Sequence, residues 1–251
     1  MLSIIVPTIR TDKWRQLYDS IRRSTAYDFE LILIGPAYSS ELSQYSNVRF
    51  IQDFGSPCRA QQIGFCNATQ KYIFGAADDC IFEVEALDEC MRMLEYMDDE
   101  YSVVVGKYSE GSPDLQNDDY YKLNKAYPAS KNILDDWVIF NCFMMRTSYL
   151  EFLGGFDCRL QIPAFGYADL AVRCQRHLWA MGKNLDRPFP VQWYEGKILH
   201  CEHGQSDHVP IELTHVYEDA PFYQHLHDNN PDRITVPMDN WKTQPAVWGK
   251  R

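Results

Sequence analysis

Two adjacent aspartates, Asp78 and Asp79, directly follow the apolar segment 71–75 (KYIFG). Ligands of open α/β sheets bind at the carboxyl ends of the strands, so a strand over 71–75 would place both carboxylates at such a site. Carboxylate oxygens suit Mg²⁺ or Mn²⁺. Consecutive side chains of an extended chain point to opposite sides, so one aspartate can hold a metal while the other bonds a ribose hydroxyl. The alternative is a solvated turn in which an aspartate caps the backbone.

Three further groups of residues have types suited to binding or chemistry. Arg59 lies in the first turn of a helix opened by Ser56-Pro57, where a helix N-terminus and a guanidinium together favour an anion; the alternative is a surface arginine. Asp169 lies near the start of a later helix, where a carboxylate is also a routine helix cap. The histidines of segment 200–208 suit a metal, but their spacing matches no closed zinc site, and an ordinary polar loop explains them equally well.

The elements that would position these residues alternate between strand and helix. Short apolar segments predict buried strands, and apolar residues at helical spacing predict amphipathic helices between them. This alternation predicts an α/β protein with a mostly parallel sheet covered by helices on both faces. The expected strands are 3–7, 29–34, 48–52, 71–75, 102–106 and 138–145, and the expected helices are 12–23, 57–68, 84–94 and 171–181.

Composition and charge exclude several classes of protein. The chain has 251 residues and a hydrophobic fraction of 45%, which is enough to form a core. Its net charge of −11 argues against a protein that binds nucleic acid or an anionic membrane through a basic surface. The acidity is concentrated in residues 76–136, which hold 5 basic and 16 acidic groups. No apolar segment approaches the roughly 20 residues of a membrane span, and no signal peptide is visible. With eight cysteines read as reduced thiols, we expect a cytoplasmic protein.

Nucleotide-binding loops of two common kinds are missing from the sequence: it contains neither GxxxxGK[ST] nor a GxGxxG after the first strand. Other features occur in a recognisable order: CRAQQIGFCNAT, then YIFGAADDC, then the Gly-Gly-Phe-Asp of 143–157, then FGYADLAVRCQRHLWAMG at 165–182. This order resembles the GT-A fold glycosyltransferases, specifically the family-2-like group of inverting enzymes, over roughly residues 2–182.

The resemblance implies a metal-dependent enzyme that moves a sugar from a nucleotide-diphospho-sugar, with a UDP-sugar favoured, to an acceptor hydroxyl of a glycan or small molecule, and inverts the anomeric centre. Mn²⁺ or Mg²⁺ would assist the leaving diphosphate. A GT-A domain would span 1–205, with a nucleotide-binding half (1–106) and an acceptor half (107–205). Residues 206–251 would form a C-terminal extension packed on it.

The resemblance also assigns roles to individual positions. The expected base is Asp169, the expected metal ligands are Asp79 and His203 (with His200 as an alternative), the expected acceptor-side residues are Trp137 and Asp136, and the expected nucleotide-binding residues are Pro7, Thr8, Arg10, Arg59 and Asp78.

Three positions depart from the family pattern. Gly35-Pro36 stands where the family usually has an acidic pair that helps to read the base, and Ala76 and Ala168 stand where it usually has acids. The register of the Asp78/Asp79 site is therefore open. Two alternative functions also stay open: a nucleotidyltransferase, and a degenerate domain that binds sugars or partners without catalysis.

Overall fold

The computed structural model describes the chain except for residues 111–139, 141, 183–190, 203–209 and 249–251. Its centre is an eight-stranded mixed sheet with the order β3-β2-β1-β4-β7-β6-β8-β5. The strands are β1 (Leu2–Pro7), β2 (Phe29–Gly35), β3 (Val48–Gln52), β4 (Tyr72–Gly75), β5 (Cys80–Phe82), β6 (Val103–Glu110), β7 (Phe143–Arg146) and β8 (Val191–Cys201).

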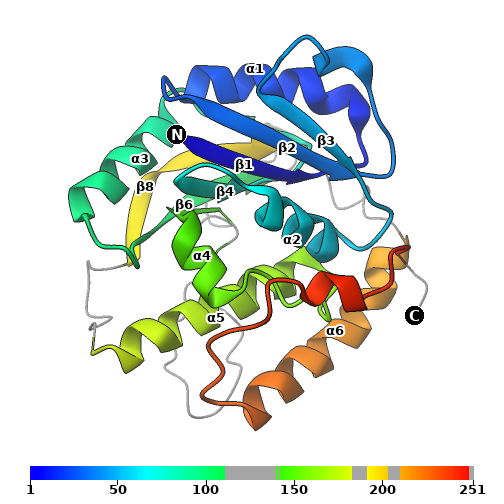
Figure 1. Cartoon of the computed structure of the whole chain (residues 1–251), viewed down its shortest axis with the longest axis vertical. Helices are drawn as coiled ribbons and strands as arrows, with labels where there is room; N and C mark the ends of the chain where they lie inside the picture. The colour runs from blue at the N-terminus through cyan, green and yellow to red at the C-terminus, as the bar shows by residue number, and fades with distance from the viewer. Residues whose placement is uncertain (111–139, 141, 183–190, 203–209, 249–251) are drawn as a thin grey trace.

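Helices cover both faces of this sheet (Figure 1). The α-helices are α1 (Trp14–Ser24), α2 (Pro57–Asn67), α3 (Ala86–Met97), α4 (Thr147–Leu153), α5 (Pro163–Ala180) and α6 (Pro210–Asn229), and the short 3-10 helices are η1 (Thr11–Lys13), η2 (Ser40–Leu42) and η6 (Asn240–Thr243). The sheet lies between α1 and α3 on one side and α2, α4 and α5 on the other. No helix among the described residues is long and apolar enough to cross a membrane.

Side-chain alternation along the strands builds two separate cores. In β2, Leu31 and Leu33 belong to the apolar cluster of α1 and α3, whereas Ile32 and Ile34 belong to the cluster of α2, α4 and α5. All four side chains are fully buried. A stretch of strand buried on both faces is apolar on both, which is why residues 31–34 show no polar alternation.

The first half of the sheet follows the predicted parallel pattern. β1 pairs in parallel with β2 and β4, and β2 pairs in parallel with β3. Because the chain leaves β1 first to one side and later returns to the other, β1 and β4 form a switch point, where open α/β sheets bind ligands. In the second half, β7 runs antiparallel to both β4 and β6, and β5 antiparallel to β8.

Most predicted elements are present, with shifted ends. The strand expected over 138–145 is β7, which begins only at Phe143, and the helix expected from residue 171 begins at Pro163. The short helix α4 was not predicted. Ser56 caps α2 as expected: its side chain accepts a hydrogen bond from the Arg59 amide, and Pro57 occupies the first turn.

The C-terminal segment packs against the rest of the chain. The carboxylate of Asp219, in α6, accepts hydrogen bonds of 2.6 and 2.7 Å from the amides of Gln161 and Ile162, just before α5. The segment after α6 then continues along α2, where η6 makes contacts. The boundary predicted at residue 205 lies outside the described residues.

Candidate functional site

A pocket of about 340 Å³ opens at the carboxyl ends of β1, β2 and β4. Four expected nucleotide-binding residues and one expected metal ligand line it: Pro7, Thr8, Arg10, Asp78 and Asp79. The rest of the lining comes from segments distant in sequence, including the start of α5, the end of β8 and the C-terminal segment. The pocket therefore lies at the switch point between β1 and β4.

Asp78 is a structural anchor for the loop that follows β1. One carboxylate oxygen accepts hydrogen bonds from the amides of Ile9 and Arg10, each at 2.7 Å, and from the hydroxyl of Thr8 at 3.1 Å. The other oxygen accepts one from the Arg10 guanidinium at 2.8 Å. Asp78 is almost completely buried. Its charge is thus used to shape the loop and to aim Arg10, which leaves little capacity for a ribose or a metal.

Asp79 has different surroundings. It is buried on the pocket wall, and its carboxylate lies 3.7 Å from the Arg10 guanidinium. One carboxylate oxygen and the thiols of Cys80 and Cys201 all lie within 4.8 Å of one another. The two aspartates thus have different neighbours: Asp78 bonds the loop after β1, and Asp79 lies beside two thiols.

The close approach of β1 and β2 explains the glycine at the end of β2. A Cβ atom on Gly35 would lie 1.8 Å from the carbonyl oxygen of Thr8, so no larger residue fits. The hydroxyl of Thr8 in turn accepts a hydrogen bond of 2.7 Å from the Trp14 indole. Pro36 follows on the pocket wall. The region where the family carries acids is thus uncharged and sterically tight.

Arg59 does not line the pocket, contrary to the prediction that it approaches the nucleotide. It is buried and pairs with Asp53, with its Nε 3.1 and 3.2 Å from the two carboxylate oxygens. Its guanidinium also lies 4.9 Å from the centre of the Trp241 ring and donates hydrogen bonds to the carbonyl groups of Trp241 and Gln244. Since Asp53 is a pocket residue, Arg59 acts on the pocket only through its partners.

The C-terminal segment reaches the pocket through contacts that start at Arg59. Val247 forms a β-bridge with Phe54, and the Trp248 amide donates a hydrogen bond of 2.6 Å to the Phe54 carbonyl. Trp248 then forms part of the pocket wall. No role was predicted for Trp248. In the sequence it is an isolated aromatic residue in a segment of weak periodicity, which does not point to a binding site.

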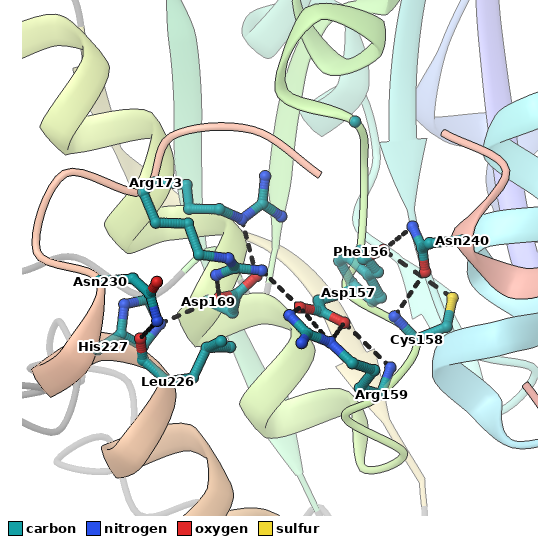
Figure 2. A network of polar contacts seen from close by, with 12 residues as sticks. Phe156, Asp157, Cys158, Arg159, Asp169, Arg173, Leu226, His227, Asn230 and Asn240 are labelled. Atoms are coloured by element: carbon teal, nitrogen blue, oxygen red, sulfur yellow. Dashed lines mark hydrogen bonds and ion pairs between the residues drawn. The ribbon is translucent and has the colours of Figure 1, made fainter. Parts of the chain in front are cut away.

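Asp169 lies in a buried ion-pair cluster, not on the pocket wall (Figure 2). It has no exposed surface; one oxygen lies 2.8 Å from Arg173 Nε, and the other contacts Arg233 and lies 3.0 Å from His227 Nε2. Burial raises the pKa of this carboxyl, but Arg173 and Arg233 outweigh it and hold the pKa well below its ordinary value. A general base needs access to its proton and a pKa near the working pH, so the prediction for Asp169 conflicts with the structure.

The directions in which side chains leave α5 explain why the prediction for Asp169 was wrong. Residues two apart on a helix point roughly 200° apart, so Tyr167 and Asp169 cannot both face the pocket. Tyr167 lines it, while Asp169 faces the α6 side. Burial raises the pKa of the Tyr167 phenol well above its ordinary value, so the hydroxyl stays protonated and can donate a hydrogen bond.

The Gly-Gly-Phe-Asp segment holds the same cluster together. Gly154 has a φ of 85°, and a Cβ there would lie 1.7 Å from the Val236 carbonyl oxygen. The carboxylate of Asp157 lies 2.6 Å from both Arg159 and Arg233. This motif therefore connects α4, α5 and the C-terminal segment, and its Phe156 lines the pocket.

Three predicted residues, His203, Trp137 and Asp136, lie outside the described residues, and their roles stay predictions. The alternative ligand His200 is buried on β8, opposite Ile81 in the strand pairing, and is not among the clustered metal-binding groups that the described residues form.

Comparison with known proteins identifies the fold. No protein-family model and no curated protein matches the chain. Crystal structures of S. aureus TarS, a GT-A-type glycosyltransferase, are similar. TarS 1–349 superposes with a TM-score of 0.59 at 13% identity, covering 91% of this chain and 66% of that chain.

Two further structures contain ligands. The complex of TarS 1–349 with UDP gives a TM-score of 0.55 at 13% identity and covers 88% of this chain and 64% of that one. The complex with UDP-GlcNAc gives 0.57 at 13% identity and covers 91% and 67%. Our chain thus spans about two thirds of the length of TarS 1–349. At this identity the similarity concerns the fold, and the chain has the GT-A fold that the order of its motifs predicted.

Proposed function

We propose that this chain is a glycosyltransferase that transfers a sugar from a UDP-sugar to an acceptor hydroxyl, with inversion. The observation that carries the proposal is the position of the pocket: it lies at the β1/β4 switch point of a GT-A fold. Similar structures have been determined with UDP and UDP-GlcNAc.

The pocket offers one described cation to a diphosphate. Arg10 is the only arginine, lysine or histidine among the described lining residues, and its side chain is 29% exposed. Asp78 fixes this guanidinium through the 2.8 Å contact. A pre-oriented cation stabilises the negative charge that develops on a departing diphosphate without reorganising during the reaction. We therefore assign Arg10 to the diphosphate.

The acceptor hydroxyl must lose a proton as it attacks the anomeric carbon from the face opposite the diphosphate. Three carboxylates line the described part of the pocket: Asp53, Asp78 and Asp79. Asp53 is paired with Arg59, and Asp78 accepts four hydrogen bonds. Asp79 lies on the pocket wall, 3.7 Å from the Arg10 guanidinium, and we assign it to the proton or the cation, while Asp136 and Trp137 stay on the proposed acceptor side.

The expected Mn²⁺ or Mg²⁺ fits the described donor atoms poorly. Both ions prefer oxygen ligands, yet one carboxylate of the pair, Asp78, is occupied by hydrogen bonds. The other, Asp79, stands beside two thiols. The described residues of the pocket therefore do not suit either ion.

Isothermal titration of the chain with UDP, UDP-GlcNAc and GDP, with and without Mn²⁺, tests the donor assignment. We expect UDP and UDP-GlcNAc to bind and GDP to bind more weakly. Release of UDP from UDP-GlcNAc in the presence of candidate sugar acceptors then tests transfer. Absence of any nucleotide binding would refute the proposal.

A second candidate, a sugar- or nucleotide-binding domain without catalysis, is favoured by one observation: the residue expected as the base, Asp169, is buried in ion pairs away from the pocket. This candidate predicts nucleotide binding without turnover for any acceptor, whereas the enzyme predicts both.

A further inference from the structure

Two cysteines face each other beside the pocket. β5 and β8 pair antiparallel with Cys80 directly opposite Cys201, and their sulfur atoms lie 3.5 Å apart. Both thiols are buried, and both residues line the pocket. Asp79, the residue before Cys80, places a carboxylate oxygen within 4.8 Å of both sulfurs. Three residues that commonly ligate metals thus converge on one wall of the pocket.

We propose that Asp79, Cys80 and Cys201 form a site for a thiolate-preferring divalent cation, with Zn²⁺ as the expected ion. Zinc accepts thiolate and carboxylate ligands, and a site with three protein ligands leaves a fourth position for water or substrate. Because all three residues line the pocket, that fourth position faces the pocket. This inference concerns metal binding itself and does not depend on the proposed sugar transfer.

The spacing of the donor atoms suits zinc. With Zn–S bonds of about 2.3 Å, the sulfurs of a tetrahedral site lie roughly 3.7 Å apart, close to the 3.5 Å between Cys80 and Cys201. Atoms up to 4.8 Å apart, the limit for the set that includes the Asp79 oxygen, need to approach by about 1 Å to share an ion with bonds of 2.0–2.3 Å.

Backbone contacts hold the ligands in place. The Ala77 amide donates a hydrogen bond of 3.3 Å to the Cys80 sulfur, and such a contact orients a ligating side chain. The Glu202 amide donates to the Asp79 carbonyl at 3.2 Å, which joins the loop before β5 to the end of β8. The two segments that carry the ligands are thus connected independently of any ion.

Ligand softness favours zinc over the ions expected from the sequence. Thiolates select Zn²⁺ over Mg²⁺ and Mn²⁺. Two thiolates and one carboxylate carry three negative charges against two on the cation. Arg10, which is paired with Asp78 at 2.8 Å, also lies 3.7 Å from Asp79, beside the remaining negative charge.

Metal titration of the reduced, chelator-treated chain tests the site without any sugar donor. We expect Co²⁺ to bind with one-to-one stoichiometry, to give a thiolate-to-cobalt charge-transfer band, and to be displaced by Zn²⁺. Cys80→Ala and Cys201→Ala should each remove the band and weaken Zn²⁺ binding by more than the roughly 10–100-fold loss typical of a second-shell change. The matched control is Cys90→Ala, which removes an equally buried thiol on α3 that lies outside the pocket.

Asp79→Asn provides a second test that preserves both buried thiols. We expect the charge-transfer band to persist, and the Zn²⁺ affinity to fall by at least about tenfold. The proposal is overturned if wild-type protein shows no charge-transfer band, or if Cys80→Ala and Cys201→Ala bind Zn²⁺ as tightly as Cys90→Ala. The proposal is also overturned if the reduced protein takes up no metal and the two cysteines form a Cys80–Cys201 disulfide once the reductant is removed. That result would assign the pair to redox chemistry. Any of these results leaves the proposed nucleotide binding untouched, because that is measured separately.

Discussion

Replacing Asp169 with asparagine distinguishes a structural role from a catalytic one. In the structure the Asp169 carboxylate is the charge partner of Arg173, at 2.8 Å, and both side chains have no exposed surface. It also contacts Arg233 and His227. An asparagine of nearly the same size keeps one acceptor oxygen but removes the negative charge.

The expected loss of stability follows from the arginine charges that stay buried without their carboxylate partner. Arg173 also donates hydrogen bonds to the carbonyl oxygens of Leu153 and Gly155, which solvate the guanidinium but do not neutralise it. Arg233 keeps a second partner, Asp157 at 2.6 Å. Removing one partner of a buried ion pair costs about 3–5 kcal/mol. We therefore expect Asp169→Asn to lower the free energy of unfolding by about this amount, out of the roughly 5–15 kcal/mol typical of a folded domain.

Urea unfolding followed by far-ultraviolet circular dichroism measures this change. With an m-value of about 3 kcal/mol per molar urea, the midpoint should fall by about 1–1.7 M. The control is Asp232→Asn, which removes an exposed aspartate next to Arg233 and should shift the midpoint by less than about 0.2 M. If Asp169→Asn is as stable as this control, and nucleotide binding survives but sugar transfer is lost, the reasoning is refuted and Asp169 is restored as the base.

Three further predictions concern the same cluster and the pocket. The pKa of Asp169 is lower in the folded chain than in the unfolded chain, so its ionised carboxylate stabilises the fold above the unfolded-state pKa, and this stabilisation is lost as the pH falls through the folded-state pKa. The wild-type chain should therefore lose more stability to urea than Asp169→Asn between about pH 5 and 2. Equal losses for the two proteins would contradict this. Arg10→Gln should weaken UDP binding about 10–100-fold, the value of a charge-assisted hydrogen bond, but leave uridine binding within about twofold; equal losses for both ligands in calorimetry would exclude a diphosphate contact. Trp248→Ala should weaken UDP binding about 2–10-fold through a lost ring contact, with little change in the urea midpoint, and unchanged affinity would remove the C-terminal segment from the nucleotide site.

Local structure was largely readable from the sequence. The apolar segments that became β1, β2 and β4 are buried on both faces, so their composition alone predicts parallel strands between helices. The capping serine and following proline marked the start of α2 because their preferences act within a single turn. The ends of β7 and α5 were less accurate, since strand pairing and capping by distant residues such as Asp219 decide them.

Only part of the candidate site could be predicted from the sequence. Asp78 and Asp79 could be predicted because they follow a strand whose carboxyl end lies at the ligand-binding edge of the sheet, and the family resemblance added Pro7, Thr8 and Arg10. Arg59 and Asp169 were assigned to the wrong environment, since helix position in the sequence does not reveal which partners the side chain meets. Cys201 and Trp248 were missed because their roles depend on pairings with Cys80 and Phe54, 121 and 194 residues away in the chain.

The sequence by itself determined the α/β class, the strand edge at which the pocket lies, and the pairing of Asp78 and Asp79 at that edge, because these follow from periodicity and from strand ends. Only the tertiary structure decided what each charge is used for. It assigned Asp78 to the loop after β1, and Asp79 to a wall shared with two thiols. The physical reason is that a carboxylate's role depends on the cations, amides and thiols within a few ångströms, and long-range packing brings those together.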